Sequence, residues 1–263
     1  MSERDDQIVR RTELPAEEPS GRTSSTEGAT EGSGASGGSV PDSDVAAVAA
    51  PAPVDAEADR LAALHQRARE HAEAGELDAA VATYREILKR DPGHVRARNN
   101  LALILERRGE VGKALAELEL ALQKEPDNVS LLTNRAAILI GTLRYGDAEA
   151  DLRRALKLEE SNAEVLTSLG AVFCKSGRWR QAVEPLRRAV ELDPNRASAH
   201  YYLGEAYNHV DQLPAALAAY EKAAALQPTN WRAHKGVGNV LDRMGRPAEA
   251  GLAHQRARDV QRR

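Results

Sequence analysis

The sequence predicts an all-α protein: a right-handed α-solenoid of helix-turn-helix repeats, preceded by an N-terminal tail. Three observations predict this class. Prolines recur at one fixed interval, small residues recur at fixed places between them, and aromatic residues make up only 3% of a chain that is 42% hydrophobic. Because β-branched and aromatic residues favour strands, a chain so poor in rings suits closely packed helices better than a β-sandwich or barrel.

The first element is the segment 1–58, which we expect to be a disordered acidic tail. It holds 12 acidic residues and 4 arginines, and from Pro15 onward it consists mostly of Gly, Ser, Thr, Glu, Ala and Pro. Such a composition has too little apolar surface to offset the entropy of ordering. Thr12, which follows Arg10 and Arg11, is a candidate phosphoacceptor, because a phosphate there would change the local charge and hydrogen bonding.

Segments that would direct the chain to a membrane or out of the cell are not predicted. No signal peptide is recognisable, and no stretch approaches the roughly 20 apolar residues of a membrane span. The single cysteine, Cys174, cannot form an internal disulfide, which favours a reducing compartment. We therefore expect a cytoplasmic protein without direct membrane insertion.

The second element is the segment 59–263, which we divide into six repeats. Pro92, Pro126, Pro194 and Pro228 are evenly spaced along the chain, except that Glu160 takes the place of a proline between the second and third of them. Numbering each of these prolines as repeat position 32 gives the repeats 61–94, 95–128, 129–162, 163–196, 197–230 and 231–263.

Each repeat is predicted to contain two amphipathic helices, because its apolar residues are spaced by 3, 4 and 7. Alanine or glycine stands at positions 8 and 20 of every repeat, where two helices would cross closely. The first helix is expected to end at a left-handed glycine, represented by Gly75, Gly109, Gly177 and Gly245. The later proline ends the second helix.

This pattern resembles the tetratricopeptide repeat. In the fifth repeat the matching residues are His200, Leu203, Gly204, Tyr207, Ala216, Tyr220, Ala223 and Pro228. Some residues depart from the pattern: Arg67 and Arg135 at position 7, Glu160 in place of the proline, and His254 at position 24. Terminal repeats tolerate polar substitutions because one face has no neighbour, but this reason does not cover the third repeat.

The resemblance implies that positions 2, 5, 6, 9, 12 and 13 line a concave groove that holds a peptide or helix of a partner. Asparagines suit peptide backbone, arginines suit carboxylates, and adjacent tyrosines supply contact area. The residues of this set that we expect to bind are Arg69, Arg96, Asn99, Asn100, Arg107, Asn134, Lys175, Tyr201, Tyr202, Asn208, Arg232, Lys235 and Asn239. The middle of the set is small and apolar and its ends are more basic. We therefore expect a partner with an apolar anchor and acidic flanks; a solvated face that binds nothing is the alternative.

The sequence predicts a non-enzymatic scaffold or adaptor. The alternative is a targeting or regulatory subunit of a separate enzyme, such as a kinase or glycosyltransferase system, and the tail could regulate the groove by returning residues 5–14 to it. No cofactor is predicted, and no metal either, since His200 and His234 have no further ligands to complete a zinc set. Segment 59–263 has a net charge of +4 without a concentrated basic stripe, so we expect no nucleic-acid partner.

Overall fold

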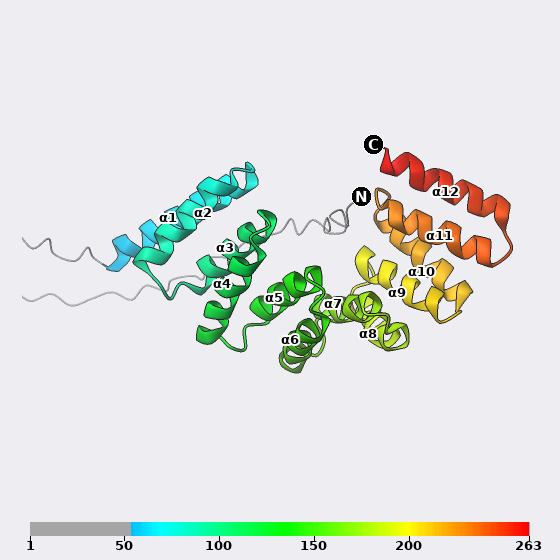
Figure 1. Cartoon of the computed structure of the whole chain (residues 1–263), viewed down its shortest axis with the longest axis horizontal. Coiled ribbons are helices and arrows are strands. Elements are labelled where there is room, and N and C mark those ends of the chain that lie inside the picture. Colours follow the sequence, from blue (N-terminus) through cyan, green and yellow to red (C-terminus); the bar gives the residue numbers. More distant parts are fainter. Residues whose placement is uncertain (1–53, 263) are drawn as a thin grey trace, which may run out of the picture. The chain divides into compact units, whose positions relative to one another are not determined.

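The computed structural model describes residues 54–262, and these form twelve helices and no strand (Figure 1). The helices are α1 (Val54–Glu73), α2 (Leu77–Arg90), α3 (Val95–Arg107), α4 (Val111–Lys124), α5 (Val129–Gly141), α6 (Tyr145–Leu158), α7 (Ala163–Lys175), α8 (Trp179–Leu192), α9 (Ala197–His209), α10 (Leu213–Leu226), α11 (Trp231–Arg243) and α12 (Pro247–Gln261). From α3 onward each odd-numbered helix packs against the next, and the His65 ring of α1 meets the Tyr84 ring of α2. The predicted all-α solenoid of helix-turn-helix repeats is confirmed.

Helix α1 begins earlier than the sequence analysis places the first repeat. Its first turn starts at Val54, inside the segment 1–58 that was assigned to the tail. Residues 54–58 include two alanines and a glutamate and contain no glycine or proline, so this segment favours a helix. The repeat pattern missed this turn because its periodic positions begin only at residue 61.

The turn between the two helices of each repeat has the same backbone conformation throughout. Glycines at position 15 have φ angles between +73° and +79°, as the sequence predicts, and Leu143 and Asp211 adopt the same left-handed conformation at φ 61° and 62°. In all six repeats the N–H of position 16 donates to the carbonyl of position 11 at 2.8–2.9 Å. This bond closes the helix end in the manner of a Schellman motif.

The turn between repeats does not depend on its proline. Asn162 N–H donates to the Glu159 carbonyl at 3.2 Å, and Asn128 N–H donates to the Glu125 carbonyl at 3.2 Å in a turn that has the proline. The side chains of Asn128 and Asn162 both accept hydrogen bonds from backbone N–H groups in the first turn of the next helix. An N-terminal cap of this kind satisfies donors that the helix cannot, which explains why Glu160 is tolerated.

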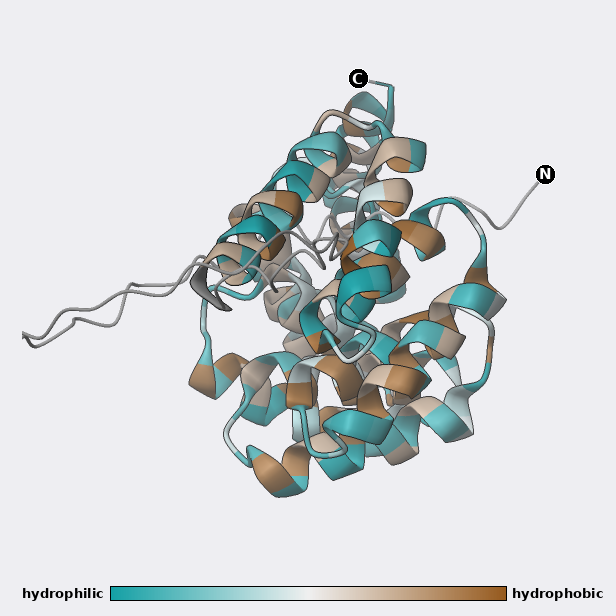
Figure 2. Ribbon diagram, turned by 90° about the vertical axis from the view of Figure 1, so that its left-hand side faces the viewer, coloured by the Kyte–Doolittle hydropathy of each residue, from teal (hydrophilic) through white to brown (hydrophobic). Residues whose placement is uncertain are grey.

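Small residues at the predicted crossing points allow the helices to approach one another. The alanines at positions 8 and 20 are fully buried, at 0% exposure. The Tyr220 ring of α10 fills the space between Gly204 of α9 and Gly236 of α11, where an added Cβ would lie 2.8 Å and 2.6 Å from the ring. Figure 2 shows the hydropathy of each residue along the helices, and apolar stretches alternate with polar ones. The shortage of aromatic residues therefore follows from close helix packing.

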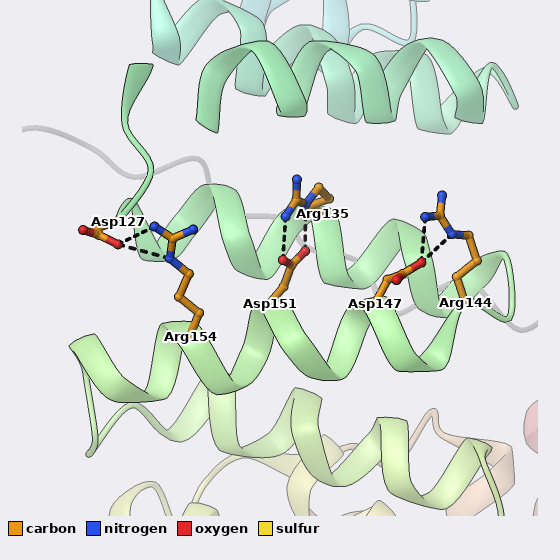
Figure 3. A network of polar contacts seen from close by, with 6 residues as sticks. All are labelled: Asp127, Arg135, Arg144, Asp147, Asp151 and Arg154. Carbon is orange, nitrogen blue, oxygen red and sulfur yellow. Dashed lines mark hydrogen bonds and ion pairs between the residues drawn. The ribbon is translucent and has the colours of Figure 1, made fainter. Parts of the chain in front are cut away.

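The unusual Arg135 of the third repeat has a partner that the sequence did not reveal. Its guanidinium makes a fork with the carboxylate of Asp151, with Nε–Oδ2 at 2.7 Å and Nη2–Oδ1 at 2.6 Å. Asp151 is 6% exposed, and Figure 3 shows the pair between α5 and α6. The hydrogen bond to this carboxylate raises the pKa of Arg135. The fifth repeat has the buried apolar residues Leu203 and Ala219 at the positions of Arg135 and Asp151, so the ion pair replaces an apolar pair there.

The departures in the first and last repeats also have local explanations. Arg67 is exposed on α1. The His254 ring lies against Gly238, and its Nε2 is 2.9 Å from the carboxylate of Asp242. The polar residues are accommodated at the two ends of the described helices because no further helix packs there.

Candidate peptide-binding face

The predicted binding positions lie on successive first helices, and we call this set the first-helix face: positions 2, 5, 6, 9, 12 and 13 of α1, α3, α5, α7, α9 and α11. Hydrogen bonds from an arginine at position 13 to the backbone carbonyl of position 12 in the preceding repeat join two pairs of successive first helices. Arg107 Nη1 donates to the Ala72 carbonyl at 3.3 Å, and Arg243 Nη1 donates to the Asn208 carbonyl at 2.5 Å. Because α5, α7 and α9 also pack against one another, the row is unbroken.

Near α1 this face carries a chain of hydrogen-bonded polar side chains. Asn134 Nδ2 donates to Asn99 Oδ1 at 2.8 Å, Asn99 Nδ2 lies 3.5 Å from Asn100 Oδ1, and Asn100 Nδ2 is 3.2 Å from His65 Nε2. Asn100 and His65 are buried, whereas Asn99 and Asn134 are half-buried. The structure thus brings three of the five predicted asparagines together, with Asn99 and Asn134 half-buried and Asn100 buried.

Asn100 also supports the interior of the first two repeats. It hydrogen-bonds to the hydroxyl of Tyr84, whose pKa is raised by burial. The His65 ring meets Tyr84 edge-on at 5.6 Å between centroids. Because the buried amide of Asn100 hydrogen-bonds to His65 of α1 and to Tyr84 of α2, it links α1, α2 and α3. Its role is therefore to hold these helices in place.

The middle of the first-helix face carries small and apolar side chains beside polar ones such as Asn134 and Ser168. Leu103 and Ile140 are half-buried and Ala137 is exposed, while Ala171 and Cys174 are buried. Burial raises the pKa of the Cys174 thiol, which is therefore held in its neutral form. The accessible apolar surface of this stretch therefore comes from Leu103, Ala137 and Ile140, and the exposed Glu164 at position 2 of the fourth repeat adds a negative charge beside it.

Cations flank the apolar middle. Arg107 and Lys175 are exposed at position 13 of the second and fourth repeats. Arg69 lies 3.9 Å from Glu73, and its Nε is buried without a hydrogen-bond partner. Arg69 and Arg96 both lie close enough to Tyr84 to act on its pKa. Arg69, Arg96 and Arg107 thus place three cations at the α1 and α3 end of the face, where Glu73 and Glu106 add two acids.

Toward the other end of the face, Tyr201 of the adjacent tyrosine pair is held by contacts within the solenoid. Tyr201 packs against the rings of Tyr202 and Tyr220, at centroid distances of 5.2 Å and 5.9 Å, and its hydroxyl donates to Glu205 at 2.6 Å. Burial, and then the nearby carboxylate, raise the pKa of Tyr201. Tyr201 therefore helps to hold α9 and α10 together, and both tyrosines are half-buried.

The remaining predicted residues lie on α9 and α11. Asn208 accepts hydrogen bonds from Arg243, and Asn239 is exposed. The guanidinium of Arg232 and the ammonium of Lys235 lie over the Trp231 ring, at 5.1 Å and 5.9 Å from its centroid. Trp231, which the sequence analysis did not select, thus adds an aromatic side chain in contact with two cations.

A second feature that sequence reasoning missed lies at the turn between α7 and α8. The rings of Trp179 and His209 stack in parallel, with centroids 3.8 Å apart and an angle of 6°. Burial, and then the charge of Arg243, lower the pKa of His209. Their positions 17 and 13 in adjacent repeats could have suggested the contact, since residues of neighbouring repeats meet at fixed offsets.

His200 and His234, which share position 4 of adjacent repeats, each contact a backbone carbonyl. His200 Nε2 lies 3.0 Å from the Pro194 carbonyl and His234 Nε2 lies 3.0 Å from the Pro228 carbonyl, so each contacts the turn before its own helix. Among residues 54–262 no group of three or more His, Cys, Asp or Glu side chains could hold a metal ion. Thr12 and the segment 5–14 lie outside the described residues. None of the helices in the described part is long and apolar enough to cross a membrane.

The arrangement defines a class of protein: an α-solenoid whose first helices form one row. The chain belongs to the tetratricopeptide-repeat family. A tetratricopeptide repeat model matches residues 65–129 and 210–260, and a second TPR repeat model matches residues 170–208. The family and the fold support a role as a protein-interaction scaffold, with a protein or peptide as the partner.

Solved structures show the same fold. The chain resembles pilF of Pseudomonas aeruginosa with a TM-score of 0.68 and 22% identity, over 76% of this chain and 93% of that one. It resembles MamA of Desulfovibrio magneticus RS-1 with a TM-score of 0.57 and 25% identity, over 64% and 95%. It also resembles YrrB, described as a TPR protein with an unusual peptide-binding site, with a TM-score of 0.54 and 21% identity over 68% and 92%. No curated protein matches the sequence significantly.

Proposed function

We propose that the protein is an adaptor that captures an extended peptide or a helix of a partner on its first-helix face, by binding alone. The observation that carries this proposal is the order of chemistry along the face. Half-buried asparagines lie next to an apolar middle, and exposed cations flank that middle. The description of YrrB as peptide-binding agrees with such a use of the fold.

Each part of the face has a place in this proposal. The apolar side chains Leu103, Ala137 and Ile140 receive an apolar anchor of the ligand, because burying that anchor removes its surface from water. Asn99 and Asn134 offer amide groups to the peptide backbone, and Arg107 and Lys175 attract acidic residues on either side of the anchor. The expected ligand is therefore an acidic segment with one apolar residue near its middle.

A matched pair of variants tests this proposal. Ala137 and Ala218 are both exposed alanines within helices, but Ala137 is on the first-helix face and Ala218 is on the second helix of its repeat. We expect Ala137→Arg to remove the partner proteins found by crosslinking mass spectrometry in cells, because the new side chain fills the apolar middle. Ala218→Arg should leave those partners in place. The same partner set for both variants would contradict the proposal.

A further inference from the structure

A cleft on the edge of the solenoid adjoins the first-helix face, with which it shares His209 at position 13 of α9. Its volume is about 420 Å³, and it is formed by the turn between α7 and α8 together with the end of α9 and the turn that follows. The lining side chains include Arg178, Trp179, Arg180, Gln181, His209 and Val210. This size accommodates one or two side chains of a partner and falls within the range of small binding sites.

The floor of this cleft includes a flat aromatic platform. The parallel stack of Trp179 on His209 joins two successive repeats, which fixes both rings. Trp179 is half-buried and His209 is exposed, so the platform is accessible from solvent. Rigid aromatic surfaces of this kind contribute large contact area at a low cost in side-chain entropy, and they are enriched at binding hot spots.

The charges of the cleft are engaged with one exception. Arg178 pairs with Glu149 at 2.7 Å and lies over the Phe173 ring, and the carboxylate of Asp211 pairs with Arg243. Arg180 is exposed, and its guanidinium makes no hydrogen bond or ion pair with any residue of the described segment. A cation without a partner beside an aromatic platform favours a carboxylate that adjoins an apolar side chain.

Leu143 extends this edge by one repeat. It occupies the same turn position as Gly177, with a φ of 61° that glycine adopts more readily, and the residue is 71% exposed. A left-handed leucine costs about 1 kcal/mol or more in strain, and its exposed side chain gains nothing from the fold. Because residues in strained conformations cluster at binding and switch sites, the exposed Leu143 supports an interaction surface at this edge.

We propose that this edge, formed by Leu143, the stack of Trp179 on His209, and Arg180, is a second docking surface for an acidic peptide segment of a partner. An apolar or aromatic side chain of that segment lies on the platform, and an adjacent carboxylate pairs with Arg180. The surface shares His209 with the first-helix face, but Leu143, Trp179 and Arg180 lie outside the positions that define that face. The proposal does not depend on peptide binding by the first helices.

Tryptophan fluorescence tests this proposal directly, because Trp179 and Trp231 are the only tryptophans of the chain. The full chain carrying Trp231→Phe reports on Trp179 alone. It is titrated with capped hexapeptides that contain one phenylalanine followed by two aspartates, and with the same peptides carrying asparagine in place of aspartate. We expect a saturable change in emission with the acidic peptides and about tenfold weaker binding after Arg180→Glu, a change equivalent to roughly 1.4 kcal/mol.

Two control variants separate the two surfaces. Lys222→Glu makes the same charge change at an exposed lysine of α10, and Ala137→Arg alters only the first-helix face; both should bind like the parent chain. The proposal is overturned if the acidic peptides leave Trp179 emission unchanged up to millimolar concentration, or if the asparagine peptides bind equally well. It is also overturned if Arg180→Glu binds like Lys222→Glu, or if Ala137→Arg abolishes the signal. Circular dichroism of each variant shows whether its helices are retained.

Discussion

The buried pair of Arg135 and Asp151 gives the sharpest test of how the third repeat is held together. Replacing Arg135 with leucine leaves the carboxylate of Asp151, 6% exposed, without either of its two hydrogen bonds. Removing one partner of a buried ion pair typically costs about 3–5 kcal/mol. Because the side chain of Arg135 is 28% exposed, water reaches the vacated site, and we expect a loss of about 3 kcal/mol.

Replacing both partners should restore most of this stability. The fifth repeat has Leu203 and Ala219 at the same two positions, and both are 6% exposed. The double variant Arg135→Leu with Asp151→Ala places these same two residue types in the third repeat. Exchanging a buried ion pair for apolar residues is often neutral or stabilising. We expect the double variant to unfold within about 1 kcal/mol of the parent chain.

Urea unfolding followed by far-ultraviolet circular dichroism measures these differences. Repeat arrays can unfold in more than one step, so hydrogen exchange of α5 and α6 should accompany the curves and locate the change. The reasoning is refuted if Arg135→Leu alone costs less than about 1 kcal/mol, or if the double variant is as unstable as the single one. Either result would show that the two hydrogen bonds from Arg135 do not offset the cost of burying the Asp151 carboxylate.

Four further expectations follow from the described contacts. Leu143→Gly relieves the left-handed leucine, and because glycine also stabilises the unfolded chain, the net gain should be about 0.5 kcal/mol; a lower urea midpoint would contradict it. Gly236→Ala places a Cβ 2.6 Å from the Tyr220 ring and should cost about 1–2 kcal/mol in the same assay despite the better helix propensity of alanine. Burial, and then a neighbouring guanidinium, lower the pKa of His209, so NMR titration should give a pKa below the ordinary histidine value of about 6.5. The free energy of unfolding linked to this ring should be highest above about pH 6.5 and should fall as the pH decreases below it, because the unfolded chain then binds the proton more readily. Burial raises the pKa of Cys174, so Ellman's reagent should react slowly with the folded chain and rapidly in urea; equal rates would show that the thiol is accessible.

The asparagines illustrate how much of the candidate site could be predicted. Their repeat positions place Asn99, Asn100 and Asn134 on one face, and the structure joins them in a single hydrogen-bonded chain. The sequence does not distinguish Asn100 from the other two. Its burial depends on Tyr84 and His65, which lie on two other helices, and no pattern within one helix contains that information.

The sequence alone determined the repeat, the helices and the small residues at their crossings. These features are local, because the helical turn and the steric demands of close packing recur with the same period in every repeat. Only the tertiary structure decided that Arg135 pairs with Asp151 and that Trp179 stacks on His209. The two partners of each pair lie on different helices, so their contact depends on how those helices pack.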